Sequence, residues 1–194
     1  MSQSLQGMMA PELRALYRAY SNLTNLVCVG TARTTVVKSG CQATVKYSMR
    51  LAFLQGKFLS LAYDKGMGRK RICQGLILRL GDGAARWTTC DECMDRVLPI
   101  KEALASVAGV TAGMSALVPA LLVGAKKITS LNLLTRDQKL GGPSQRRYFL
   151  SGVVGPGCHR IVAVNRTSRL IESVVDNYSS ADGNYTTRTS YRYL

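Results

Sequence analysis

The most informative pattern in the sequence lies at Gly56–Gly83, GKFLSLAYDKGMGRKRICQGLILRLGDG. Two apolar runs, Phe58–Tyr63 and Ile72–Leu80, flank a glycine-bounded turn with three adjacent cations, Arg69–Arg71. Apolar runs of this length favour burial, whereas adjacent cations must stay in water. The stretch therefore predicts a cationic turn on the surface of a packed core.

The chain has 194 residues, of which 46% are hydrophobic, so it can bury a core as one domain or two small ones. Its 26 Lys and Arg residues against 11 Asp and Glu residues give a formal net charge of +15. This excess repels itself and predicts an anionic partner, either nucleic acid or an acidic lipid surface. Composition does not separate the two.

The six cysteines are scattered along the chain, and Met1–Ala10 lacks the charged and apolar regions of a signal peptide. We therefore expect reduced, intracellular thiols, many of them buried as small apolar groups. The cysteines are Cys28, Cys41, Cys73, Cys90, Cys93 and Cys158.

Local patterns give one clear helix and one ambiguous segment. Pro11–Tyr20 begins with a proline and an acid and places apolar residues at helical spacing, which predicts a helix. Cys41–Phe53 alternates apolar and polar residues, which favours a strand, but Val45, Met49 and Phe53 also fit helical spacing.

The second half of the chain reads as more helices. Thr88 or Thr89 is a suitable helix cap, and His159–Tyr178 has the apolar spacing of an amphipathic helix. Between them, KLGGPSQRR at residues 139–147 is typical of a linker. The polar tail ADGNYTTRTSYRYL, residues 181–194, is expected to be loosely held.

Motifs for catalysis and metal binding are weak. The Cys90-x-x-Cys93 spacing suits zinc, but the chain has one histidine, His159, and its neighbour Cys158 would have to turn inward with it. The Gly66–Gly68 turn lacks the spacing of a phosphate loop. We therefore expect no metal, no cofactor and no enzymatic activity.

Residues Ala103–Ala125 carry no charge and match the length of a membrane span. Their glycines and hydroxyl residues dilute the apolar content, and Pro119 interrupts the run. Two short buried helices are the favoured interpretation, and an integral membrane segment is the alternative.

The cations form several clusters with few acids nearby, which predicts a broad positive surface. Its members, as the candidate membrane- or RNA-binding residues, are Lys57, Lys65, Arg69, Lys70, Arg71, Lys126, Lys127, Arg146 and Arg147.

A resemblance sharpens this interpretation. Asp64–Gln74, DKGMGRKRICQ, resembles the segment of orthomyxovirus matrix proteins in which an acid, a base and glycine precede three cations. A turn at Gly81–Gly83 and a small-residue run from Lys101 to Gly124 follow in the same order. The resemblance covers Phe53–Lys127, and the short chain points to the isavirus type rather than the influenza type.

The resemblance implies an all-α fold, with helix at Cys41–Phe53, an N-terminal helical domain (1–138), a linker (139–147) and a C-terminal helical domain with a loose tail (148–194). It implies a viral matrix protein that polymerises with itself under the envelope and contacts acidic membrane and the viral ribonucleoprotein. The expected location is the virion, the host cytoplasm and the inner face of the plasma membrane, with the nucleus left open. The alternative function is an RNA-binding nucleocapsid-type structural protein.

Overall fold

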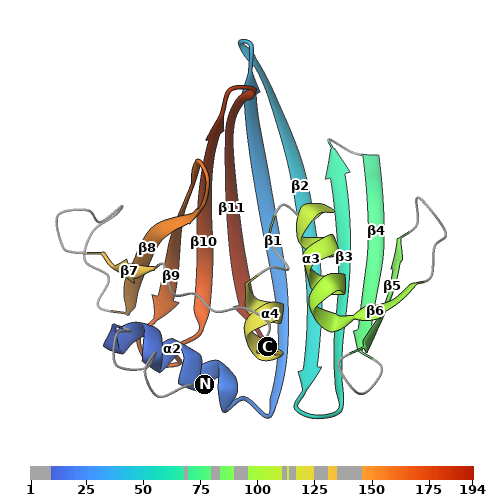
Figure 1. Ribbon diagram of the computed structural model, residues 1–194, viewed down its shortest axis with the longest axis vertical. Coiled ribbons are helices and arrows are strands. Elements are labelled where there is room, and N and C mark those ends of the chain that lie inside the picture. The colour runs from blue at the N-terminus through green and yellow to red at the C-terminus, as the bar shows by residue number, and fades with distance from the viewer. Residues whose placement is uncertain are drawn as a thin grey trace.

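The computed structural model describes residues 10–67, 70–79, 84–89, 96–110, 113, 117–124, 131–134 and 146–194. Side chains of residues 67–79, 87–89, 107, 109 and 110 are not part of this description. The described strands form one antiparallel sheet, with three helices against one of its faces (Figure 1). The face toward the helices is called the inner face below, and the opposite one the outer face.

The chain builds the sheet from two meanders that meet at β1 and β11. The strand order is β6-β5-β4-β3-β2-β1-β11-β10-β9-β8-β7. The strands are β1 (Asn25–Lys38), β2 (Cys41–Leu54), β3 (Phe58–Met67), β4 (Lys70–Arg79), β5 (Ala84–Thr89), β6 (Arg96–Pro99), β7 (Asn132–Leu133), β8 (Arg147–Gly155), β9 (Cys158–Asn165), β10 (Ile171–Ser180) and β11 (Gly183–Tyr193). The helices are α2 (Pro11–Ser21), α3 (Ile100–Val110) and α4 (Val118–Leu122).

The ambiguous segment Cys41–Phe53 is strand β2, so the helix that the resemblance implied there is wrong. Tyr47, Met49, Leu51 and Phe53 are buried on the inner face, and the residues between them are more exposed. A period of two buries one side of a strand, so the local alternation was the correct signal. A two-residue turn with positive φ at Ser39 and Gly40 joins β1 to β2, as a tight hairpin requires.

Helix α2 confirms the helix expected at Pro11–Tyr20, with a proline in its first turn. It buries Leu13, Leu16 and Tyr20 against the sheet. The uncharged run Ala103–Ala125 contributes most of α3 and the short α4, in which Pro119 occupies the first turn. None of the helices in the described residues combines the length and the apolar character that crossing a membrane needs.

The C-terminal tail is ordered at the centre of the sheet, which corrects the expectation that it is loosely held. Strand β11 pairs with β1 on one side and β10 on the other. Its last tyrosine also fixes helix α2, because the Tyr20 and Tyr193 hydroxyl oxygens lie 2.9 Å apart. Tyr193 donates to the Ile171 carbonyl at 2.6 Å, and the Ile171 amide donates to the Tyr20 hydroxyl at 3.1 Å.

The all-α fold class is therefore wrong, because most described residues lie in strands. The expected helix at His159–Tyr178 is two strands, β9 and β10, joined by a turn. In that turn the Asn165 side chain accepts hydrogen bonds from the amides of Thr167 and Ser168. The apolar spacing that resembled a helix comes from alternation in two strands separated by this turn.

The boundaries 1–138, 139–147 and 148–194 remain a prediction. Within the described residues, strands from the first and last of these segments share one sheet, since β1 pairs with β11 over ten positions from Cys28 to Val37. The residues of the expected linker lie outside the described part of the chain, apart from Arg146 and Arg147.

Candidate functional site

The inner face is apolar where helices α2, α3 and α4 lie over it (Figure 1). Each strand contributes every second residue to this surface, so the apolar side chains form cross-strand rows. The large side chains that share it are Leu26, Leu51, Phe53, Leu59, Leu61, Leu150, Val162, Val164 and Ile171.

One ion pair interrupts this apolar surface. Arg160 on β9 and Asp176 on β10 are directly opposite each other in the sheet. Arg160 donates from Nε to one carboxylate oxygen at 2.6 Å and from Nη2 to the other at 2.7 Å. Burial alone would lower the pKa of Arg160, but the hydrogen bonds and charge of Asp176 outweigh it and raise that pKa. The guanidinium therefore stays charged.

The pair does not use all the hydrogen-bonding capacity of Arg160. The side chain is 5% exposed, and its buried Nη1 atom has no hydrogen-bond partner among the described residues. A buried N–H group without a partner costs free energy comparable to a lost hydrogen bond. An oxygen acceptor placed beside Nη1 would remove this cost.

Above the ion pair the inner face extends past the helices (Figure 1). A buried hydrogen bond between the Thr34 and Thr187 hydroxyls, 2.8 Å long, marks the boundary. Beyond it, by register, lie Val36, Tyr185 and Tyr178, and the Tyr178 side chain is 41% exposed. The two tyrosine rings are in tilted contact, with centroids 5.8 Å apart. An apolar and aromatic surface is thus open to solvent next to the buried pair.

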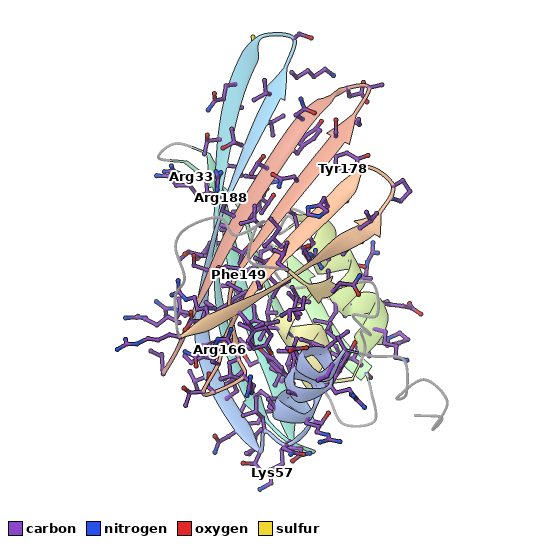
Figure 2. The ribbon with its side chains drawn as sticks, turned by 90° about the vertical axis from the view of Figure 1, so that its left-hand side faces the viewer. Arg33, Lys57, Phe149, Arg166, Tyr178 and Arg188 are labelled. Atoms are coloured by element: carbon purple, nitrogen blue, oxygen red, sulfur yellow. The ribbon has the colours of Figure 1, made fainter. Side chains whose placement is uncertain are left out.

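The outer face carries cations on its three central strands. Arg33 on β1 is directly opposite Lys46 on β2 and Arg188 on β11. All three are exposed, and Arg33 and Arg188 point away from the helices in Figure 2. Four residues further along the strands, Arg50 and Arg192 lie on either side of Val29 and are exposed as well. These five residues are called the cation rows below.

Two hollows lie beside the cation rows on the outer face of β8–β11. The larger, about 550 Å³, is lined by Arg147, Asn165, Ser168, Leu170, Glu172, Ser173, Ser190, Tyr191, Arg192 and Tyr193. The smaller, about 200 Å³, is mostly apolar and is lined by Leu134, Phe149, Ile161, Ala163, Ser173 and Val175. Ser173 lines both.

The residues that the sequence singled out are spread over the fold. Lys57 is exposed in the β2–β3 turn, at the end of the sheet away from the β1–β2 hairpin tip (Figure 2). Lys65 is half-buried opposite Tyr47, on the inner face. Arg146 and Arg147 are exposed at the start of β8, and Arg147 forms an ion pair with Glu172.

The structure describes little or nothing of the remaining predicted residues. Lys70 and Arg71 lie in β4, and only their backbone is described. Arg69, Lys126 and Lys127 fall outside the described residues, as do Cys90 and Cys93. Elsewhere in the described residues, no three or more His, Cys, Asp or Glu side chains gather as a metal site would require.

Sequence reasoning missed both the buried ion pair and the cation rows. The predicted clusters consist of cations that are adjacent in sequence, whereas Arg33 and Arg188 become neighbours only through the β1–β11 pairing. A signal was present in the i, i+4 spacing of Lys46 with Arg50 and of Arg188 with Arg192, because an even spacing keeps strand residues on one face. That signal needed the strands to be identified first.

Comparison with known proteins gives structural likeness only. No family model matches the chain, and no curated protein matches it. It is similar to a domain from Vibrio parahaemolyticus described as outer membrane lipoprotein-sorting, with a TM-score of 0.44 and 10% identity over 94% of this chain and 91% of that one. It is also similar to a LolA superfamily protein from Nitrosomonas europaea, with a TM-score of 0.43 and 9% identity over 94% and 92% of the two chains.

A third solved structure, a DUF1329 family protein from Desulfovibrio piger, has a TM-score of 0.38 and 10% identity over 94% of this chain and 92% of that one. The described part of this chain folds as a β-sheet rather than as the all-α structure that the resemblance implied. The resemblance to orthomyxovirus matrix proteins is therefore wrong. The matrix function, the nucleocapsid alternative and the virion and host locations are wrong with it.

Of the expected partners, lipid stays a prediction. Nothing in the fold or the comparisons supports a self-polymer or a viral ribonucleoprotein. The short Asp64–Gln74 motif misled because its first residues are the end of β3 and its last residues lie in β4. A run of similar residue types does not specify a helix when it lies across the end of one strand and the start of the next.

Proposed function

We propose that this protein binds an acyl amphiphile, such as a fatty acid or acyl ester, on the inner face of its sheet, and that it catalyses no reaction. The observation that carries the proposal is the buried Arg160 Nη1 group, which has no hydrogen-bond partner in the described part of the chain and lies in an apolar surface. Binding sites for small ligands are mostly apolar, with a few placed polar groups that fix orientation. Arg160 has that character.

The neighbourhood of Arg160 suits a ligand with an oxygen head and an apolar chain. Asp176 neutralises the guanidinium, so the remaining N–H group can serve a carboxylate or an ester carbonyl. The chain would run over Val36, Tyr178 and Tyr185, where the inner face is uncovered. The single histidine, His159, is exposed on the outer side of β9, away from this surface, which supports binding rather than catalysis.

We propose further that an acidic membrane is the source of this amphiphile. The observation that supports a membrane partner is the set of cation rows on the outer face, Lys46, Arg33, Arg188, Arg50 and Arg192.

The test is displacement of a fluorescent fatty-acid analogue by unlabelled palmitate and by its methyl ester. The double variant Arg160→Met, Asp176→Leu replaces the pair with apolar groups, an exchange that is often neutral for stability. A hydrogen bond to a charged group contributes about 1.5–3 kcal/mol, so affinity should fall about tenfold to a hundredfold.

The matched control is Arg147→Met, Glu172→Leu, which removes an ion pair from the outer face. It should bind the analogue as the unmodified protein does. Absence of palmitate binding by the unmodified protein would overturn the proposal. So would unchanged affinity in a folded Arg160→Met, Asp176→Leu variant.

A further inference from the structure

The cation rows are costly for the sheet that carries them. Lys46, Arg33 and Arg188 occupy directly opposed positions on three adjacent strands. Neighbouring strands are about 4.8 Å apart, and like charges directly opposite each other destabilise a sheet. The fold needs only polar residues at these exposed positions. Three adjacent cations are therefore not explained by folding, whereas a bound anionic surface would explain them.

Few acids lie near enough to neutralise the rows. On the outer side of the described strands β1, β2 and β11 there is no Asp or Glu. Asp64, on β3, is opposite Ser48 and has an interaction of its own. Glu172, on β10, is held by Arg147 and by the Asn165 amide. The positive charge of the rows thus remains available to a partner.

The outer face of the same three strands also has apolar residues at the surface. Val27 is 47% exposed and Val37 is 44% exposed, and both point outward on β1. No aromatic side chain points outward from these described strands. Single-stranded nucleic acid is bound through aromatic platforms on which bases stack, so this surface lacks that element. Cations mixed with small apolar groups fit a lipid headgroup region.

We propose that the outer face of β2, β1 and β11 docks onto an anionic lipid bilayer through Lys46, Arg33, Arg188, Arg50 and Arg192. This inference rests on the proposed function, because it names the surface from which the inner face would take its amphiphile.

The expected strength follows from the electrostatics of anionic leaflets. Each Lys or Arg near such a surface strengthens partitioning about fivefold. Removing two of the five should weaken it roughly 30-fold. Because the Debye length shortens from about 8 Å at physiological salt to about 3 Å at 1 M, high salt should release the protein.

The experiment is co-sedimentation of the full chain with vesicles of phosphatidylcholine, alone or mixed with phosphatidylglycerol. We expect binding to the mixed vesicles only. The double variant Arg33→Gln, Arg188→Gln should lose roughly 30-fold in partitioning. The control Arg18→Gln, Lys101→Gln removes the same charge from exposed positions outside the rows and should bind as the unmodified protein does.

Three results would overturn the docking proposal. The first is an equal loss in both double variants, which would make net charge rather than the rows responsible. The second is unchanged binding by a folded Arg33→Gln, Arg188→Gln variant. The third is saturable, row-dependent binding of a single-stranded RNA probe with no vesicle binding.

Failure of docking is separable from failure of ligand binding. Displacement of the fluorescent fatty-acid analogue is measured in vesicle-free solution, where Arg33→Gln, Arg188→Gln should leave affinity unchanged. If vesicle binding is lost in that variant while palmitate never binds, the docking surface stands and the inner-face site falls. If palmitate binds and vesicles do not, the reverse holds.

Discussion

The two faces of the sheet hold positive charge in opposite ways. On the inner face Arg160 is 5% exposed and donates two hydrogen bonds to the Asp176 carboxylate. On the outer face Arg33 has two cations opposite it and is exposed to solvent. Residues one position apart on a strand belong to these different environments, as Arg33 and the buried Thr34 show.

A charge requires a partner inside the protein only where it is buried. Removing a guanidinium from water is costly unless a carboxylate and hydrogen bonds compensate it. An exposed guanidinium stays hydrated without a partner inside the protein, so it is available to an anion from outside. The inner face is therefore sensitive to single substitutions, and the outer face should tolerate them in stability while losing association.

The largest effect is expected when the inner pair is broken. Asp176→Ala leaves Arg160 buried without its carboxylate and should lower the free energy of unfolding by about 3–5 kcal/mol. Chemical denaturation measures it. Glu172→Ala removes the ion-pair partner of the half-exposed Arg147 and should cost at most about 1 kcal/mol. Equal costs at the two positions would contradict the contrast between the faces.

Apolar truncation separates the faces in the same way. Leu61 on β3 is fully buried on the inner face, and Leu61→Ala should cost about 2–5 kcal/mol through lost burial and a cavity. Val27 is 47% exposed on the outer face, and Val27→Ala should stay within about 0.5 kcal/mol. The shift in the midpoint of denaturant unfolding, at an unchanged dependence of the unfolding free energy on denaturant, measures both costs. A large loss at Val27 would show that the outer face is covered in solution.

Alkaline pH should weaken the inner core. Burial raises the pKa of Cys28 from 9.0 to about 12 and, despite its hydrogen bonds, that of Tyr20 from 10.0 to about 12. A raised pKa favours the protonated form in the folded state, so the stability is present below pH 9 and is lost progressively between pH 9 and 12. Near pH 10 the loss should be on the order of 1 kcal/mol.

Denaturant titrations at pH 8, 9 and 10, with a thiol reductant present, measure this loss of stability with rising pH. Tyr178→Phe, at a 41% exposed position, should leave it unchanged. A stability that stays constant from pH 8 to pH 10 would contradict the burial of Cys28 and Tyr20.

The smallest effect has the opposite sign. Arg33→Glu places an acid between Lys46 and Arg188, so two repulsive cross-strand pairs become attractive. Stability should rise by about 0.2–1 kcal/mol, measured by thermal unfolding at low and high salt. The same variant should lose vesicle association. A destabilised Arg33→Glu variant would show that the cation rows already have anionic partners within the fold.

Part of the fold was predictable from local chemistry. Pro11 and Glu12 marked the start of α2, and alternation in Cys41–Phe53 indicated β2 before the resemblance overrode it. Strand β11 was missed because Thr187 and Thr189 are polar, although both are buried in the sheet. The Thr187 hydroxyl is satisfied by Thr34, a partner that only the β1–β11 register supplies.

The candidate sites were less predictable, because each is made by strand pairing. Arg160 and Asp176 meet across the β9–β10 hairpin, and the helix predicted over His159–Tyr178 hid that pairing. Arg33 and Arg188 are 155 positions apart in the chain. Charge counts predicted an anionic partner, which stays a prediction, and they did not locate a surface for it.

The central place of β11 has a consequence for how the protein is made. Strand β1 is synthesised before the other described strands, yet its partner on one side, β11, is synthesised after all of them. Until then β1 is the open edge of a half-sheet, a state prone to pairing with other chains. Because this closure joins segments so distant in sequence, it is an intrinsically slow step. A chain that ends before Gly183 therefore leaves two half-sheets, in which β1 and β10 each have an unpaired edge.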